Sequence, residues 1–233
     1  MSKDKPLYRK LLQKPYPEMQ MLDRESINWL TYNCRPEEVP IKEVIADYKP
    51  ILLTPYKHYL KHHASQRFNT IHGIRHQLRT MLYVWILSQY LNINDDENIK
   101  PLLIATFFHD IMRQDDNKDE LHGINSANWI GRHFVELPES VLDAVKCHNE
   151  EGTGEQKDIL CSILKAADAL DRYRLPKANW WPDQNRMPIK CPDKIINFCK
   201  YLTIETERIT CGVDNINEIF EIIESWLKRK HIA

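Results

Sequence analysis

Hydrophobic residues recur every three or four positions over much of the chain, which is the pattern of amphipathic α-helices. The clearest stripe runs through Leu78, Leu82, Trp85 and Ile86 and predicts one long helix over residues 71–91. A polar loop over residues 92–100 follows, and Pro101 fits the first turn of the next helix. Because residues 101–112 are apolar nearly all round, we expect this second helix to lie at the centre of the fold.

Similar spacing predicts helices on both sides of this pair. Towards the C-terminus they are expected over residues 121–137, 140–149, 157–175, 193–209 and 215–230, with Ser140 as a helix cap. Towards the N-terminus, shorter helices broken by prolines are expected over residues 17–30, 41–48 and 52–63. Residues 176–193 hold four prolines and two tryptophans, which predicts a long irregular segment.

The composition agrees with a helical protein. The chain of 233 residues has only six glycines, fewer than most extended-sheet or nucleotide-loop architectures use, and its 42% of hydrophobic residues suffices for a core. The predicted fold class is therefore all-α. We expect a helical domain over residues 66–233, C-terminal helices included, preceded by a helical N-terminal extension over residues 1–65 that packs on it.

The charge pattern limits the partners of the protein. The net charge is −1, from 32 basic and 33 acidic residues, and no basic tract predicts a surface for nucleic acid or for a membrane. No apolar leader or membrane span stands out, and the six cysteines form no CxxC pair. We expect a cytoplasmic protein whose thiols are reduced.

The candidate chemistry lies in histidines and aspartates placed at or near the ends of the predicted helices. The set consists of His76, His109, Asp110, His122, His148 and Asp168. Imidazole nitrogens and carboxylate oxygens are good ligands for divalent metals, and a helical bundle can gather such ligands from facing helices. The neighbours His109 and Asp110 would diverge by about 100° on a helix, so they can share an ion only near a helix end. Asp110 has two oxygens and could bridge two ions.

The order of these residues resembles the H…HD…D signature of the HD-domain metal-dependent phosphohydrolase superfamily. The segments HGIRHQLRT and KAADALDR are similar to the first and last motifs of that family, and the resemblance spans residues 71–174. The two added histidines resemble its six-ligand form, H…HD…H…H…D. The chain departs from many two-metal relatives at Asn149, where they have a second histidine, and at Arg113, where they have a lysine after the HD pair.

The resemblance implies an all-α HD-type fold that holds one or two divalent ions, drawn from Mn, Fe, Mg, Zn, Co or Ni. The first ion would be held by His76, His109, Asp110 and Asp168, and the second by Asp110, His122 and His148. Because guanidinium and ammonium groups suit phosphate oxygens, the basic residues near these ligands are candidate substrate contacts. They are Arg79, Arg113, Lys165 and Arg172. His72 is a further candidate, as a substrate contact or as a supporting residue, and Trp180 and Trp181 could cover the site.

The function implied is hydrolysis of a phosphate ester or anhydride by metal-activated water, with Asp110 as the catalytic residue that positions the water. The expected partner is a nucleotide or another small phosphorylated compound. The chain lacks a GxxxxGK[ST] loop, which argues against a P-loop enzyme. Two alternatives remain: a di-iron HD-type oxygenase with the same ligand order, and a non-catalytic module that senses a nucleotide or binds a partner.

Overall fold

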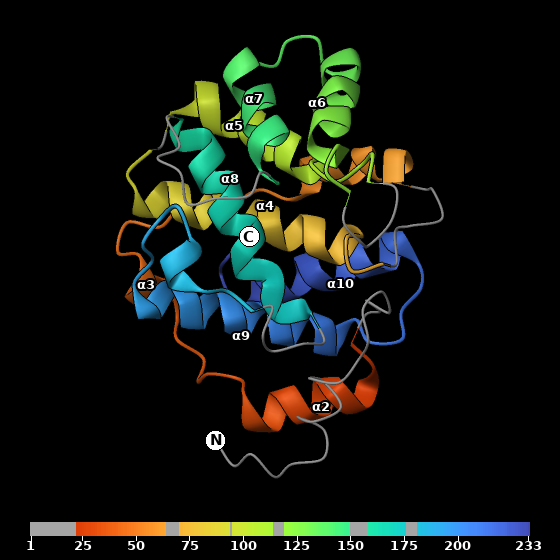
Figure 1. Ribbon diagram of the computed structural model, residues 1–233. Coiled ribbons are helices and arrows are strands. Elements are labelled where there is room, and N and C mark those ends of the chain that lie inside the picture. The colour runs from red at the N-terminus through yellow and green to blue at the C-terminus, as the bar shows by residue number, and fades with distance from the viewer. Residues whose placement is uncertain (1–21, 64–69, 94, 114–118, 150–157, 176–180) are drawn as a thin grey trace.

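A computed structural model describes residues 22–63, 70–93, 95–113, 119–149, 158–175 and 181–233. Within these ranges the protein is all-α, as predicted, and no β-strand is present. Figure 1 shows α6 (His122–His133) and α7 (Glu139–Cys147) at one end of the molecule and α2 (Arg24–Asn33) at the other, with α4 (Ile74–Tyr90) between them. No helix in the described ranges is long and apolar enough to cross a membrane.

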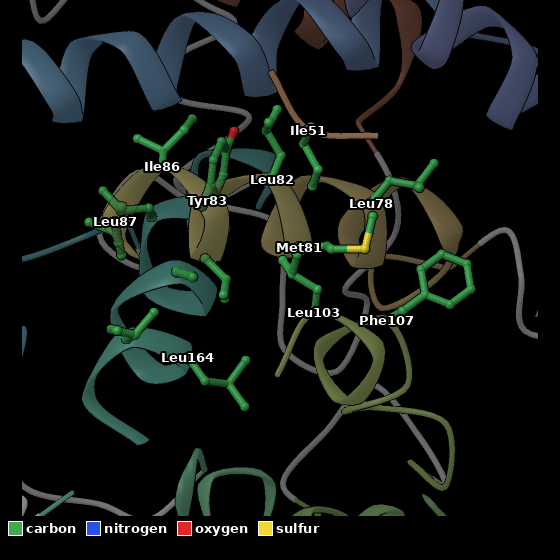
Figure 2. Packing of buried hydrophobic residues seen from close by; sticks show 14 of the residues in the cluster. Ile51, Leu78, Met81, Leu82, Tyr83, Ile86, Leu87, Leu103, Phe107 and Leu164 are labelled. Atoms are coloured by element: carbon green, nitrogen blue, oxygen red, sulfur yellow. The ribbon is translucent and has the colours of Figure 1, made fainter. Parts of the chain in front are cut away.

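Helix α4 is the centre of the fold. It packs against α5 (Asp96–Phe107), α8 (Ile159–Leu170), α9 (Asp193–Ile209) and α10 (Ile216–Arg229). Neighbours surround it, so every residue from Ile74 to Gln89 is buried except Trp85. Figure 2 shows Leu78 and Met81 of this helix beside Leu103 and Phe107 of α5. Burial of each such side chain contributes about 1.5–3 kcal/mol, which fixes the helix that carries the first candidate ligand, His76.

The long helix begins later than its hydrophobic stripe suggested. Gly73 is its N-cap residue, so His72 lies in the turn before α4 and not on the helix. The amide of His72 donates a hydrogen bond to the Thr70 hydroxyl at 3.2 Å, which holds this turn. On the helix, His72 would lie one helical turn before His76. In the loop before the helix, its ring can instead reach Asp110 from the N-terminal end of α4.

The central apolar helix also has different ends from those predicted. Helix α5 begins at Asp96, where the side chain of Asp95 accepts a hydrogen bond from the amide of Asn98 at 2.8 Å. Pro101 therefore lies inside the helix and not in its first turn. The helix ends at Phe107, and the amides of Phe108, His109, Ile111 and Arg113 then donate to carbonyls three residues earlier. His109 and Asp110 thus lie in tight turns directly after the buried helix.

Helices α6 and α7 pack against each other beyond α5. The N-cap of α7 is Pro138, so the prediction of Ser140 as a cap is wrong; proline fits there because an amide at a helix start has no intrahelical acceptor, so its missing N–H breaks no helical bond. Gly123, beside His122, allows the close approach of the two helices, since a Cβ at this position would lie 2.9 Å from the carbonyl oxygens of Val145 and Lys146. His122 and His148 are brought together by this contact.

The remaining elements complete the core around α8. Helix α8 continues into the short 3-10 helix η2 (Asp171–Arg174), and a second short one, η4 (Gln184–Arg186), lies in the proline-rich segment. A disulfide joins Cys147 to Cys161, with Cα atoms 6.5 Å apart, so the expectation of reduced thiols is wrong for these two residues. Pairing was invisible in the sequence because it depends on how the end of α7 lies against the start of α8.

The N-terminal segments pack on the C-terminal helices. The elements are α2, α3 (Ile41–Val44) and the 3-10 helix η1 (Thr54–His63). Leu22, Ile27, Trp29 and Leu30 form a small apolar cluster with Ile204 of α9. Tyr56 and Leu60 of η1 belong to the main core. Of the predicted helix over residues 17–30, the first five residues lie outside the described ranges.

Candidate metal centre

Six side chains from five separate segments converge at one place beside α4. They are His76 of α4, His109 and Asp110 after α5, His122 at the start of α6, His148 at the end of α7, and Asp168 of α8. The Nε2 atom of His76 lies 3.2 Å from Nε2 of His109 and 3.4 Å from Oδ1 of Asp168. On the other side, Nε2 of His122 lies 3.1 Å from Nε2 of His148. The structure therefore brings together the whole ligand set that the sequence predicts.

Asp110 lies between the two histidine pairs, and each of its oxygens faces one of them. Oδ2 is 3.5 Å from Nε2 of His76 and 3.7 Å from Nε2 of His109. Oδ1 is 3.2 Å from Nε2 of His122 and 3.6 Å from Nε2 of His148. The side chain of Asp110 is only 2% exposed, so these nitrogens, and not water, surround it.

The opposite nitrogen of each histidine ring is engaged away from the cluster. Three Nδ1 atoms face backbone carbonyls: His109 at 2.7 Å from Thr106, His148 at 2.6 Å from Val145, and His122 beside Asp119. A carbonyl only accepts hydrogen bonds, so each of these Nδ1 atoms carries the ring proton. In His76, Nδ1 faces the Asp171 carboxylate at 2.8 Å and is protonated for the same reason.

This proton arrangement leaves unshared electron pairs on the Nε2 atoms that converge on Asp110. Among the described residues, Oδ1 of Asp110 is buried and has no hydrogen-bond partner, which is the result expected where the Nε2 atoms that face it carry no proton. A cluster of nitrogen and carboxylate acceptors is repulsive by itself and is stabilised by a cation. The sets His76–His109–Asp168 and His109–Asp110–His148 each have ligand atoms within 4.8 Å of one another, which suits a metal ion. The residues present therefore fit a divalent ion on each side of Asp110.

Burial and charge set the protonation states that metal binding needs. Burial lowers the pKa of His109 to about 4, although the Asp110 carboxylate favours the protonated form. Burial would raise the pKa of Asp110, but His109 and His72 hold it well below its usual range. The pKa of His122 is raised because Asp110 attracts a proton there more strongly than burial opposes it. His122 is thus the position at which a proton competes most directly with a metal ion.

A second layer of charged residues holds His76 in place. Asp171, which is fully buried, accepts hydrogen bonds from Nδ1 of His76 at 2.8 Å and from Nε of Arg79 at 2.5 Å. Arg79 also forms an ion pair with Glu207 at 2.8 Å. Asp171 is not among the residues that the sequence analysis singles out. Its spacing of three residues from Asp168 was the available signal, because residues three apart lie on one face of a helix.

The predicted substrate contacts differ in where they lie. Nη1 of Arg113 is 3.1 Å from Nε2 of His122 and 3.9 Å from Oδ1 of Asp110, at the edge of the cluster. Lys165 is partly buried on α8. Arg79 is 1% exposed and bound to Asp171, so it supports His76 and does not present its guanidinium to the cluster. Arg172 has an exposed side chain, and the structure does not bring it to the ligand set.

Three further residues named from the sequence have structural partners. Nδ1 of His72 lies 2.8 Å from Oδ2 of Asp110, and burial lowers the pKa of this histidine to about 3. Nδ2 of Asn149 donates to the carbonyl of Glu120 at 2.9 Å and so ties the segment before α6 to the end of α7. Nε1 of Trp181 donates to the carbonyl of Leu175 at 3.1 Å, which anchors the proline-rich segment; Trp180 lies outside the described residues.

Comparison with known proteins adds one match. Residues 73–173 match the family model described as HD domain, and this range includes all six convergent side chains. Searches against curated proteins and against solved structures found no significant match.

Proposed function

The chain belongs to the HD-domain family through residues 73–173, and we propose that it is a metal-dependent phosphohydrolase. Members of this family are mostly metal-dependent hydrolases. The proposed reaction is the hydrolysis of a phosphomonoester or phosphodiester in a nucleotide or another small phosphorylated compound. It is supported by the convergent ligand set and by the ring protons on Nδ1 of its histidines, which leave the Nε2 atoms facing Asp110.

The observation that carries the proposal is the position of Asp110 between two pairs of histidine Nε2 atoms. His76, His109, Asp168 and Oδ2 of Asp110 would hold one divalent ion. The second would be held by the Nε2 atoms of the other pair, His122 and His148, with Oδ1 of Asp110. Ions held by these residues would supply the positive charge that phosphoryl transfer needs.

Bound divalent ions would supply a water of lowered pKa and would neutralise charge on the phosphoryl oxygens. The protein's own residues would orient the reactants. Asp110 would position the attacking water through its oxygens, while Nδ1 of His72 donates a hydrogen bond that holds Oδ2 in place. Arg113, at the cluster edge beside His122, would offset negative charge on the transferred group.

The test is metal analysis of the purified protein together with a screen for phosphate release from phosphomonoesters, phosphodiesters and nucleotides. We expect activity with a divalent ion such as manganese under anaerobic conditions, and its loss in Asp110→Ala and Asp110→Asn. The exposed Asp143→Asn variant, on α7, is the matched control and should retain activity. Full activity in both Asp110 variants would refute the mechanism.

The same screen separates the alternatives. Oxygen consumption that depends on iron, without phosphate release, would favour the oxygenase. Tight nucleotide binding by metal-loaded protein that turns over no member of the panel would favour the sensing module.

A further inference from the structure

Arg174 ends η2 beside the proposed first ion but is not one of the ligands. Its side chain is 4% exposed, and Nε donates a hydrogen bond to the carbonyl of Ile71 at 2.6 Å. This bond fixes the plane of the guanidinium against the turn that precedes α4. The two terminal nitrogens, Nη1 and Nη2, take no part in this bond.

No described residue offers Nη2 a satisfactory acceptor. Its neighbour is Nδ1 of His72 at 3.4 Å, but that nitrogen is also 2.8 Å from Oδ2 of Asp110. Because a carboxylate only accepts, the shorter contact requires a proton on Nδ1 of His72. A protonated Nδ1 cannot accept from Arg174, so His72 turns its own hydrogen to Asp110 and leaves Nη2 unsatisfied.

Nη1 of Arg174 also lacks a hydrogen-bond acceptor among the described residues, although it lies 3.4 Å from Oδ2 of Asp171. That carboxylate already accepts from His76 and from Arg79. Burying a guanidinium with unpaired N–H groups costs free energy unless a bound ligand supplies an acceptor. Nη1 and Nη2 are therefore both able to donate to a ligand.

The surroundings of Arg174 favour a negatively charged acceptor. It lines a small cavity with two further arginines, Arg75 and Arg79, and with His76, while Glu207 is the acidic residue of the wall. Asp171 stabilises the Arg174 cation most, but it is shared with Arg79; Asp168 and Asp110 contribute as well, and metal ions bound to these two carboxylates would take up their charge. In the metal-loaded protein, the positive charge of Arg174 would then be left for an anion.

We propose that Arg174 is an oxyanion-binding residue whose Nη1 and Nη2 atoms hold a phosphoryl oxygen of the substrate beside the first ion. The proposal rests on the proposed phosphohydrolase function for the identity of the anion. A guanidinium offers two parallel donors that match phosphate oxygens, which a lysine at the same position does not. Arg174 thus takes the role that the sequence had given to Arg172, two residues earlier in η2.

The test is calorimetric titration of metal-loaded protein with inorganic phosphate. We expect Arg174→Gln to weaken phosphate binding by about tenfold to a hundredfold, the effect of losing a hydrogen bond between charged groups. Arg174→Lys should also weaken binding, because it keeps the charge but loses the fork. Arg172→Gln, in the same turn, and Arg132→Gln, exposed on α6, are the comparisons and should bind as the wild type does. Metal stoichiometry and circular dichroism verify that each variant is folded and loaded.

Several outcomes would overturn the inference: no phosphate binding by wild type, unchanged affinity in both Arg174 variants, or loss of affinity only in Arg172→Gln. Lower thermal stability with unchanged affinity would mean that Arg174 only supports the fold through Ile71 and Asp171, and this also overturns it. If wild type binds phosphate through Arg174 but hydrolyses nothing in the screen, the hydrolase proposal fails and the oxyanion site stands. Should Arg174→Gln fail to fold, the lysine variant decides the question.

Discussion

Asp171 offers the sharpest test of how the site is supported, because Asp171→Asn changes its charge while keeping its shape. The carboxylate accepts from both His76 and Arg79, and it has no exposed surface. Asparagine has a single acceptor oxygen and an NH₂ group that donates. If the oxygen faces Arg79, the NH₂ group faces Nδ1 of His76 and pushes the ring proton to Nε2, where it blocks metal binding.

The size of the effect follows from the burial of the pair. Removing one partner of a buried ion pair costs about 3–5 kcal/mol, and here Glu207 still compensates Arg79, so the lower end is expected, about 3 kcal/mol. For a chain of this length such a loss lowers Tm by roughly 6–12 °C. Loss of the carboxylate that orients a ligating histidine lowers metal affinity by about 10-fold to 100-fold. The first ion should therefore bind more weakly while the second is little changed.

Two measurements check this prediction. Urea unfolding of metal-free protein gives the free-energy difference, and competition with a chelator gives the affinity of each ion. The control is Asp143→Asn, a 56% exposed residue paired with Lys146, which should stay within about 0.5 kcal/mol of wild type. An Asp171→Asn protein as stable as this control, with both metal affinities unchanged, would refute the role given to Asp171.

Two other expectations concern histidines. His122→Ala should lower the metal stoichiometry by about one ion, whereas the exposed His133→Ala on the same helix should not. If the two variants bind the same number of ions per chain, the protein has a single-ion site. Burial lowers the pKa of His63 to about 3, so between that value and about 6.5 the unfolded chain binds more protons and stability falls as pH falls. The loss from this group is about 2 kcal/mol at pH 5. His63→Phe, which keeps the stacking on Phe108, should reduce the difference in unfolding free energy between pH 7 and pH 5, and an unchanged difference would contradict it.

The helices and the ligand order could be predicted from the sequence because both depend on local patterns. The stripe through Leu78 and Leu82 needs only the periodicity of a helix, and buried faces follow from it. Helix ends were less predictable. Asp95, and not Pro101, marks the start of α5 as its N-cap residue, because a cap depends on a side chain reaching a particular amide.

The supporting residues could not be predicted, because their roles depend on partners far along the chain. Arg172 and Arg174 are the same residue type in one short turn, yet the first is exposed and the second is buried against Ile71. A shift of two positions in a tight 3-10 turn changes the direction of a side chain, and no pattern in the sequence distinguishes the two arginines. The partner of Asp171 was equally hidden, since Arg79 lies 92 positions earlier.

The placement of the ligands at helix ends has a physical reason that joins fold and chemistry. The last carbonyls of a helix lack partners within it. Thr106 and Val145 lie at the ends of α5 and α7, and Nδ1 of His109 and of His148 donates to their carbonyls; the Thr106 carbonyl also accepts a longer bond from the His109 amide at 3.3 Å. One bond thereby satisfies the helix end and fixes the ring proton on the side away from Asp110. The same histidines inside a helix would find those carbonyls already bonded, and the choice between the two ring nitrogens would be lost. The pattern of histidines that follow apolar helices therefore prepares a metal site as well as ending a helix.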